Sequence, residues 1–295
     1  MSRSARHQPV LLREVLDSLD LRSGLTVVDG TVGAGGHSRP ILEQIGPQGR
    51  LIGLDRDPMM LTLAAQTVAA PNCDLIQASY ADLPDVLRER DMTTVDRILL
   101  DLGLSSDQLA DDARGFSFSA TGPLDLRFDT RSGQPAWKVL EEISDHDLQD
   151  ILERYGEERF SGRIARAIVS RQQTAPIRTA GDLAEVVAAA IPASARRTAT
   201  KHPATRVFQA LRIAVNTELE HLEHALNDSL HRTLKPGGRL VAVTFHSLED
   251  RLVKTAFRDK SRWHNLTPKP ITARAVERKM NPRSRTAKLR AAIRT

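Results

Sequence analysis

Short apolar runs alternate with helical patterns through the first hundred residues of the chain. Four continuous apolar runs predict strands, at 25–29, 50–55, 73–79 and 96–101. Helical patterns lie between these runs, at 38–46, 58–70 and 82–90. Continuous apolar strands joined by helices are typical of a parallel sheet that is covered on both faces, so the pattern predicts an α/β fold.

This rhythm stops near residue 110 and resumes near residue 215. The segment 115–135 is rich in Gly, Ser, Pro and charged residues and has no strand period. Helical patterns follow, at 144–156, 159–171, 179–191 and, with one expected bend or break, from about 204 to 234. Two of them begin with a residue pair at capping-box spacing, Ser144 with Asp147 and Thr179 with Asp182.

Strand character returns after the inserted helices. The run 234–245 has strand character behind a Pro-Gly-Gly turn at 236–238, a helical pattern covers 247–259, and 287–294 is expected to be a closing strand. We therefore expect a discontinuous α/β domain at 1–110 and 210–295 and an inserted all-helical domain at 111–209.

The composition is that of an ordinary globular protein. The 295 residues are 40% hydrophobic and 27% charged, which is enough for a sizeable core. The single cysteine, Cys73, excludes a disulfide framework and fits a reducing compartment. The basic N-terminus lacks the apolar core of a signal peptide, and no run of eighteen apolar residues exists, so we expect a cytoplasmic protein with no membrane partner.

The charge is distributed unevenly along the chain. Of the 42 Lys and Arg and the 37 Asp and Glu, ten and one fall in 261–295, which leaves 32 and 36 for the rest. A mildly acidic body with a strongly basic tail favours a polyanionic partner such as nucleic acid, although a solvated tail without a partner has the same composition.

The decapeptide DGTVGAGGHS at 29–38 directly follows the first predicted strand. Gly33, Gly35 and Gly36 permit a tight strand-to-helix turn and a close approach of the backbone to a ligand. Asp55 ends the second strand, where Rossmann-type sheets place a carboxylate on a ribose. The combination points to a ligand that contains adenosine.

The same loop separates two kinds of adenosine ligand. A dinucleotide fingerprint would have a third glycine where this chain has Ser38. The carboxylate of Asp29, four residues before Gly33, is unfavourable beside a pyrophosphate but suits an ammonium group. The loop therefore favours S-adenosylmethionine over NAD.

Asp101 ends the fourth predicted strand, in DLGLSSDQL. The carboxyl ends of parallel strands face the ligand crevice, so we expect Asp101 near the reacting group. His202, His221 and His246 form no cluster with Cys or acidic residues, and no metal is expected. His246 follows the fifth strand, and the pattern leaves open whether it reaches the crevice or packs.

Many short motifs together resemble the bacterial 16S rRNA (cytosine-N4)-methyltransferase family, also called MraW or RsmH. They are HQPVLLREVL (7–16), DGTVGAGGHS (29–38), LDRDP (54–58), LLDLGLSSDQL (99–109), RGFSF (114–118), GPLDLR (122–127), YGEERF (155–160), RIARAI (163–168), LAEVVAAA (183–190), KHPATRVFQALRI (201–213), LKPGGRL (234–240), FHSLEDR (245–251) and NPRSR (281–285). The resemblance covers nearly the whole chain, and most of these motifs are not generic to S-adenosylmethionine folds.

The resemblance implies methyl transfer from S-adenosylmethionine to the exocyclic N4 of one cytosine in the decoding centre of 16S rRNA. It implies a Rossmann-like class I methyltransferase domain with an inserted helical domain for substrate recognition. The cofactor positions that it implies are Gly35, Gly36, His37, Asp55, Tyr80, Asp101 and Gln108. The Tyr80 ring would stack on adenine, and the backbone N–H of His37, rather than its imidazole, would serve the ligand.

The expected catalytic group is Asp101, acting through its side chain or its backbone carbonyl as acceptor for the proton of the amine. DNA amino-methyltransferases often carry an aromatic residue in the equivalent motif, where this chain has Asp-Leu-Gly-Leu at 101–104. Base positioning is therefore expected from another ring, with Phe116, Phe118 and Trp137 as candidates.

Three groups of basic residues are candidate contacts for the 16S rRNA of the small ribosomal subunit: Arg159, Arg163 and Arg166; Arg196, Arg197 and Lys201; and the basic tail. A homodimer is left open. Two other functions fit parts of the sequence, an NAD-dependent oxidoreductase and an RNA-binding ribosome-assembly factor with a relic cofactor pocket.

Overall fold

The computed structural model describes residues 9–198 and 202–295 and divides into two compact units. The first comprises residues 1–103 and 219–295, and the second residues 104–218. The helical unit thus extends further at both ends than the 111–209 expected from the pattern. The reason at the C-terminal boundary is that the apolar face of α11 (Thr205–Asn216) packs into the helical core.

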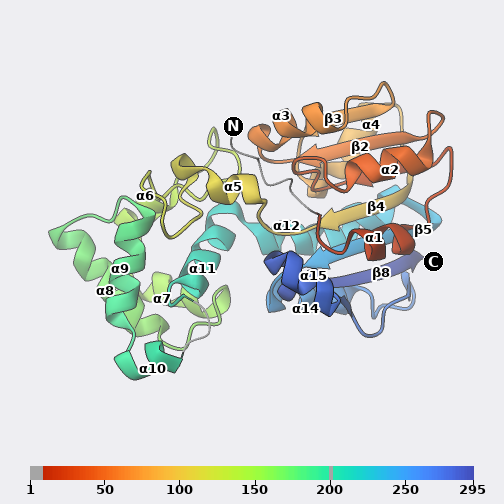
Figure 1. Cartoon of the computed structure of the whole chain (residues 1–295). Coiled ribbons are helices and arrows are strands. Elements are labelled where there is room, and N and C mark those ends of the chain that lie inside the picture. Colours follow the sequence, from red (N-terminus) through yellow and green to blue (C-terminus); the bar gives the residue numbers. More distant parts are fainter. Residues whose placement is uncertain (1–8, 199–201) are drawn as a thin grey trace. The chain divides into compact units, whose positions relative to one another are not determined.

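In the first unit the described residues form an eight-stranded sheet in the order β3-β2-β1-β4-β5-β8-β6, with β7 paired to β8 (Figure 1). The strands are β1 (Thr26–Asp29), β2 (Arg50–Asp55), β3 (Cys73–Gln77), β4 (Val95–Asp101), β5 (Leu234–Thr244), β6 (Trp263–Asn265), β7 (Ile271–Thr272) and β8 (Lys288–Arg294). Strands β1 to β5 pair in parallel, and β8 is antiparallel to β5. The four N-terminal strands and the closing strand lie where the apolar pattern predicts them.

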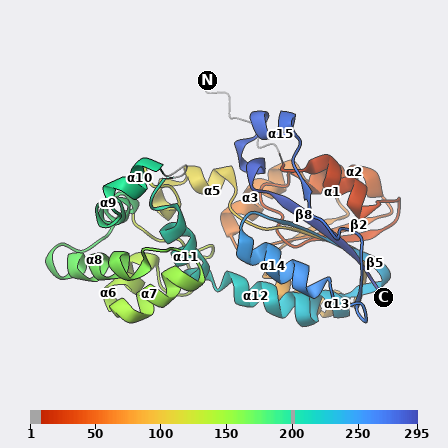
Figure 2. The same cartoon turned by 90° about the horizontal axis from the view of Figure 1, so that it is seen from below.

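Helices cover both faces of this sheet (Figure 2). One face carries α1 (Leu12–Leu19), α2 (Ser38–Ile45) and α3 (Pro58–Thr67); the other carries α4 (Leu83–Arg88), α12 (Glu218–His224), the π-helix η3 (Ala225–Ser229), α13 (Leu230–Thr233) and α14 (Ser247–Ala256). Successive strand residues serve opposite faces, so Leu99 packs on the α1 side and Leu100 on the α4 side. This double burial explains why the strands are continuously apolar.

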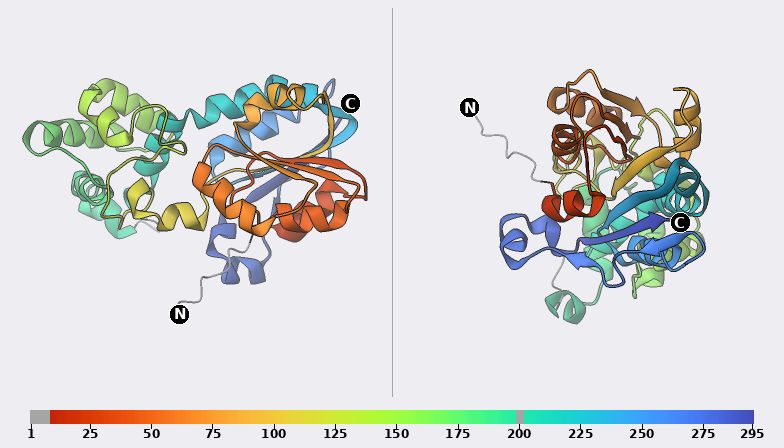
Figure 3. Two further views of the ribbon diagram at one scale, coloured as in Figure 1. Left: turned by 90° about the horizontal axis from the view of Figure 1, so that it is seen from above. Right: turned by 90° about the vertical axis from the view of Figure 1, so that its right-hand side faces the viewer.

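The basic C-terminal segment is part of the fold and not a free tail. It forms β6, β7, α15 (Ala275–Met280), the short helix η4 (Pro282–Arg285) and β8. The α15 segment projects from the sheet beside α1 (Figure 3). The backbone N–H of Leu11, just before α1, donates to Glu277 Oε1 at 2.7 Å. Carboxylates hold three of its basic side chains: Arg290 and Lys288 contact Asp250, and Arg274 contacts Glu14.

The second unit is helical. Its helices are α5 (Ser106–Ala110), α6 (Ala136–Glu142), α7 (Asp145–Arg154), α8 (Ser161–Thr174), α9 (Ala180–Ala190), α10 (Ala193–Thr198) and α11. The Thr179–Asp182 capping box begins α9, as the sequence predicts. Thr217, at φ +48°, ends α11, and this is the single break expected in the long helical pattern.

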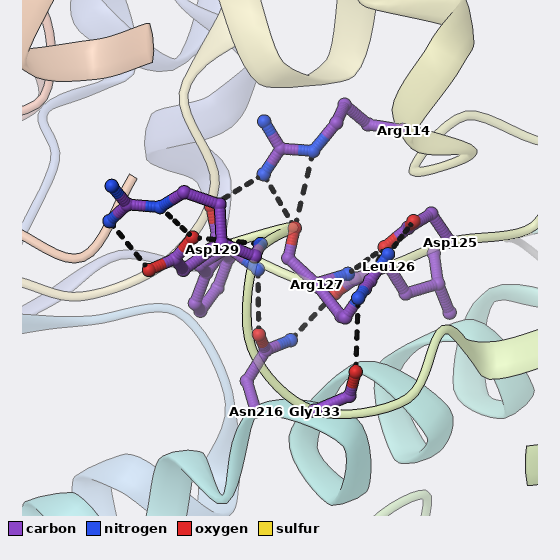
Figure 4. Close-up of polar contacts among 9 residues, drawn as sticks. Arg114, Asp125, Leu126, Arg127, Asp129, Gly133 and Asn216 are labelled. Carbon is purple, nitrogen blue, oxygen red and sulfur yellow. Dashed lines mark hydrogen bonds and ion pairs between the residues drawn. The ribbon is translucent and has the colours of Figure 1, made fainter. Parts of the chain in front are cut away.

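The irregular segment between α5 and α6 is fixed by side-chain hydrogen bonds (Figure 4). Asn216 Nδ2 donates to the Leu126 carbonyl at 2.6 Å, and its Oδ1 accepts the Phe128 N–H at 2.7 Å. Arg114 donates to the carbonyls of Arg127 and Phe128, and Arg127 pairs with Asp125. These bonds hold the left-handed backbone of Leu126 at φ +63°, which an apolar L-residue rarely adopts alone.

Candidate active site

The glycine loop connects β1 to α2 at the carboxyl edge of the sheet. Gly33 and Gly35 have φ values of +53° and +84°, which any other residue adopts at a cost. A Cβ at Gly35 would lie 3.1 Å from Val68 Cγ1 and 3.2 Å from Thr67 Cβ. This glycine is therefore needed for the turn and for close packing on the end of α3, and a methyl group there would press on the helix.

Asp55 joins the glycine loop to the end of β2. Its Oδ2 accepts the Gly33 N–H at 3.0 Å, and its Oδ1 accepts the Asp57 N–H at 2.9 Å. Burial raises the pKa of Asp55 to about 7, although these two N–H groups act to lower it. Each carboxylate oxygen accepts two hydrogen bonds, so both can still receive a ribose hydroxyl.

Asp29 lies inside the loop and holds its shape. It is 1% exposed; its Oδ2 accepts the Ser38 hydroxyl at 2.6 Å and its Oδ1 the Thr31 N–H at 3.3 Å. Thr31 Oγ1 in turn accepts the backbone N–H of Asp101 at 2.6 Å. Ser38 therefore has a structural role in addition to replacing the third glycine of a dinucleotide fingerprint. Its hydroxyl donates a hydrogen bond to Asp29, the acid that was expected to face an ammonium group.

The side chain of Asp101 lies at the end of β4 against His37. Its Oδ2 is 3.4 Å from His37 Nδ1, and its Oδ1 is buried with no hydrogen-bond partner in the described structure. Burial raises the pKa of Asp101 to about 7; the charge of Arg283 lowers it and that of Glu249 raises it. The backbone N–H is already bonded to Thr31, and the side chain keeps an unused acceptor.

Tyr80 and Gln108 occupy different units. Tyr80 begins η1 (Tyr80–Asp82) after β3 and is 9% exposed, and its Cβ would lie 3.0 Å from a Cβ at Gly30. Gln108 belongs to the helical unit, where its Oε1 accepts the Ser105 N–H in the capping box of α5. The first unit thus brings together the glycine loop, His37, Asp55, Tyr80 and Asp101, but not Gln108.

The structure adds a ring that the sequence did not single out. A Cβ at Gly103 would lie 2.9 Å from Phe245 Cδ2, and Gly103 has a φ of +116°. The half-buried Phe245 ring therefore lies beside the Asp-Leu-Gly-Leu motif that lacks an aromatic residue. Its position directly after the fifth strand, in Phe-His-Ser, was the available signal. Its neighbour His246 caps α14, accepting the Glu249 N–H, which favours the packing interpretation of this histidine.

The three aromatic candidates of the second unit are already engaged there. Phe116 is 5% exposed in the helical core, Phe118 stacks on His202 at 4.5 Å, and the Arg178 guanidinium lies 4.4 Å from the centre of the Trp137 ring.

The basic side chains of α8 are arranged as the sequence suggests. Arg163 and Arg166 are exposed, as is Arg159 just before the helix, while Ile164 and Ile168 are buried. Arg196 and Arg197 are exposed on α10, and Lys201 lies outside the described residues.

The described residues contain no group of three or more His, Cys, Asp or Glu side chains placed to hold a metal ion. None of their helices has the length and apolar character needed to cross a membrane.

Comparison with known proteins identifies relatives along the whole chain. The model of the MraW methylase family matches residues 4–295. The ribosomal RNA small subunit methyltransferase H of Trichlorobacter lovleyi is 45% identical over 306 residues, which cover 97% of each chain.

Solved structures give weaker likenesses. An rRNA methylase from Streptococcus thermophilus is 11% identical with a TM-score of 0.44, covering 96% of this chain and 93% of that one. A SAM-dependent O-methyltransferase from Thermotoga maritima is 10% identical with a TM-score of 0.43, covering 98% and 68%.

Proposed function

This chain belongs to the MraW methylase family, and we propose that it transfers a methyl group from S-adenosylmethionine to the exocyclic N4 of a cytosine in the decoding centre of 16S rRNA. The observation that carries the proposal is Oδ1 of Asp101, which is buried and has no hydrogen-bond partner among the residues that the structure describes. It lies at the carboxyl edge of the sheet beside the glycine loop and Asp55. An acceptor in that place suits an amine that must lose a proton.

The residues around the loop fit S-adenosylmethionine better than a dinucleotide. Asp55 offers two acceptors to ribose hydroxyls, and Ser38 stands where a dinucleotide fingerprint has its third glycine. Gly35, Gly36, the His37 backbone and the Tyr80 ring complete the predicted cofactor site, and Gln108 stays a prediction from the family. When bound, S-adenosylmethionine supplies an electrophilic methyl group, and no metal is part of the proposal.

Asp101 has two tasks in this proposal. The amine lone pair of cytosine is delocalised into the ring, so an acceptor for one N–H orients the amine and raises electron density on nitrogen. The same acceptor can then take the proton. Phe245 is the proposed ring of the first unit for contact with the target base, because it lies beside Gly103 in the Asp-Leu-Gly-Leu motif.

The helical unit is proposed to recognise the substrate RNA. The exposed Arg159, Arg163 and Arg166 offer phosphate contacts, which give affinity that depends on salt but not on sequence. Specificity would then come from the single base and from the shape of the subunit. A homodimer is a further possibility that gel filtration with light scattering would test.

A methyl-transfer assay tests the proposal. It uses labelled S-adenosylmethionine and small ribosomal subunits from cells that lack this protein. We expect one methyl group per subunit, mapped by mass spectrometry to one cytosine, and none on subunits from cells that contain the protein. Asp101→Ala should abolish transfer. Tight binding to unmodified subunits without any transfer would instead support the ribosome-assembly factor.

A further inference from the structure

The His37 ring is held in one orientation by its surroundings. The side chain is 6% exposed, and its Nε2 lies 3.0 Å from the carbonyl oxygen of Val10. A carbonyl oxygen only accepts, so Nε2 carries the proton in this contact. In the neutral ring Nδ1 is then an acceptor, and Nδ1 is the atom that faces Asp101.

The two oxygens of Asp101 have different surroundings. Oδ2 lies 3.4 Å from His37 Nδ1, and Oδ1 is buried without a hydrogen-bond partner in the described structure. Buried acceptors in folded proteins are nearly always satisfied, so an unsatisfied one in a candidate site indicates a ligand donor. The arrangement leaves Oδ1 for the substrate and Oδ2 for the histidine.

We infer that His37 and Asp101 form a proton relay, in which Asp101 Oδ1 accepts the proton from the cytosine amine and His37 Nδ1 accepts a proton from Asp101 Oδ2. The inference rests on the proposed function. The N4 lone pair forms the bond to the methyl carbon while the S–CH3 bond breaks and its electron pair stays on sulfur. The relay begins with Asp101 protonated on Oδ2 and His37 neutral. The proton that N4 sheds reaches Oδ1 while the Oδ2 proton moves to Nδ1, so the pair gains one proton and ends as neutral Asp101 and an imidazolium. No further reactant is required.

Charged groups on four other elements surround the pair. Asp29 of β1 and Glu277 of α15 act on His37, and Arg283 of η4 and Glu249 of α14 act on Asp101. Burial lowers the pKa of His37, while Asp29, the Val10 carbonyl and Glu277 oppose that change. Burial also raises the pKa of Asp101, so the two groups are brought closer in proton affinity, as transfer between them requires.

The relay predicts a particular pH dependence. The wild-type pair of His37 and Asp101 cannot accept the amine proton once both residues are protonated. That state places a buried imidazolium beside a neutral acid, so it forms only at a pH below the usual histidine pKa. Without His37, Asp101 must be ionised before it can accept a proton, and its own raised pKa of about 7 sets the limit. Removing the histidine should therefore move the acid limb of the rate profile to higher pH.

The test uses the full chain and single-turnover methyl transfer to unmodified small subunits, from about pH 5.5 to about pH 9. His37→Gln can keep a donor to Val10 without a base at Nδ1, and His37→Asn places an amide near Asp101. Because Asp101 remains, we expect the rate of methyl transfer to fall by roughly 10- to 100-fold in both variants. This is less than the loss of about 10²- to 10⁴-fold that is typical when a general base is removed. The acid limb of the pH–rate profile should move to higher pH. His264→Gln, on the exposed edge strand β6, is the matched control and should behave as wild type.

Calorimetric titration with S-adenosylmethionine checks that each variant keeps a folded cofactor site. Nitrogen-15 spectra of histidine in the wild-type protein should show the Nε2-protonated neutral ring at neutral pH, and this measurement needs no variant. A proton on Nδ1 instead of Nε2 would overturn the relay, as would a uniform loss of rate in both variants with an unshifted profile. A wild-type protein that transfers no methyl group would overturn the proposed function, and the relay step with it.

Discussion

Two aspartates of the same unit, the buried Asp250 and the partly buried Asp101, have opposite electrostatic surroundings. Asp250, on α14, accepts from Arg290 Nε at 2.6 Å and from Lys288 Nζ at 3.0 Å. Burial alone would raise the pKa of Asp250, but these hydrogen bonds outweigh it and lower the pKa. Among the described residues, Asp101 has His37 at 3.4 Å from one oxygen and no hydrogen-bond partner for the other, and its pKa is raised.

The difference separates a charge that stabilises the fold from one that we propose is kept for a ligand. A buried carboxylate with two cations is satisfied, and removing it leaves the cations uncompensated. A buried carboxylate with an unused acceptor lowers stability at neutral pH until a donor arrives. Natural proteins accept such a cost where chemistry requires it.

The largest expected effect is on catalysis at Asp101. Asp101→Asn should reduce single-turnover methyl transfer by about 10²- to 10⁴-fold, because an amide cannot take the proton. The same variant should raise the free energy of unfolding at pH 8 by about 1 to 4 kcal/mol, since the folded-state charge penalty disappears. Denaturant titrations measure this gain, and Asp17→Asn, on an exposed pair, should change neither quantity. A loss of stability in Asp101→Asn would contradict the comparison.

The next effect is the loss of the structural charge at Asp250. Asp250→Ala should lower the free energy of unfolding by about 3 to 5 kcal/mol, because Arg290 is 3% exposed and would be left unpaired. Asp228→Ala, which breaks the exposed pair with Arg232, should cost less than about 1 kcal/mol. Equal costs for the two variants would show that Asp250 is not the structural charge described above.

The third prediction concerns the carboxylate oxygens of Asp55, which can still accept hydrogen bonds from the ribose of the cofactor. Asp55→Asn should weaken S-adenosylmethionine binding by roughly 10- to 100-fold, because hydrogen bonds to a charged acceptor are worth about 1.5 to 3 kcal/mol. Wild-type affinity should fall as the pH drops below about 7, where the carboxyl of the free protein is protonated. Calorimetry at several pH values measures both effects, and the Asn variant should show a flatter dependence.

The smallest expected effect is the pH dependence of stability. Asp55 and Asp101 have folded-state pKa values of about 7 against 3.8 when unfolded, so the folded state keeps protons that the unfolded chain has lost. Their contribution to stability is therefore full below pH 3.8 and is lost as the pH rises through about 7. Asp250 contributes in the opposite direction, and its stabilisation is lost only in acid.

The double variant Asp55→Asn, Asp101→Asn isolates the contribution of the two acids. Its free energy of unfolding should exceed that of the wild type by an amount that grows steadily from pH 5 to pH 8, because the two wild-type acids lose their contribution over this range. A constant difference between the two proteins across this range would contradict the raised pKa values.

Local patterns predicted much of this fold. The continuous apolar runs gave β2 its bounds of Arg50–Asp55, and Thr179 with Asp182 located the start of α9. The closing strand of the basic segment after residue 260 was predicted, but the pairing of its basic side chains was not, because Asp250 and Glu14, which hold them, are distant in sequence. The amino-acid composition gives the number of charged residues, but it does not show which of them form ion pairs in the folded protein.

The sequence by itself determined the α/β rhythm, the helical insertion, the glycine loop with Asp55, and the acid at the end of the fourth strand. These follow from local periodicity and turn chemistry, which act over a few residues. Only the tertiary structure decided that Asp29 is enclosed by Ser38 and Thr31, that Phe245 lies beside Gly103, and that His37 faces Asp101. Those contacts join different strand ends across the edge of the sheet, and their burial sets the proton affinities on which the proposed chemistry depends.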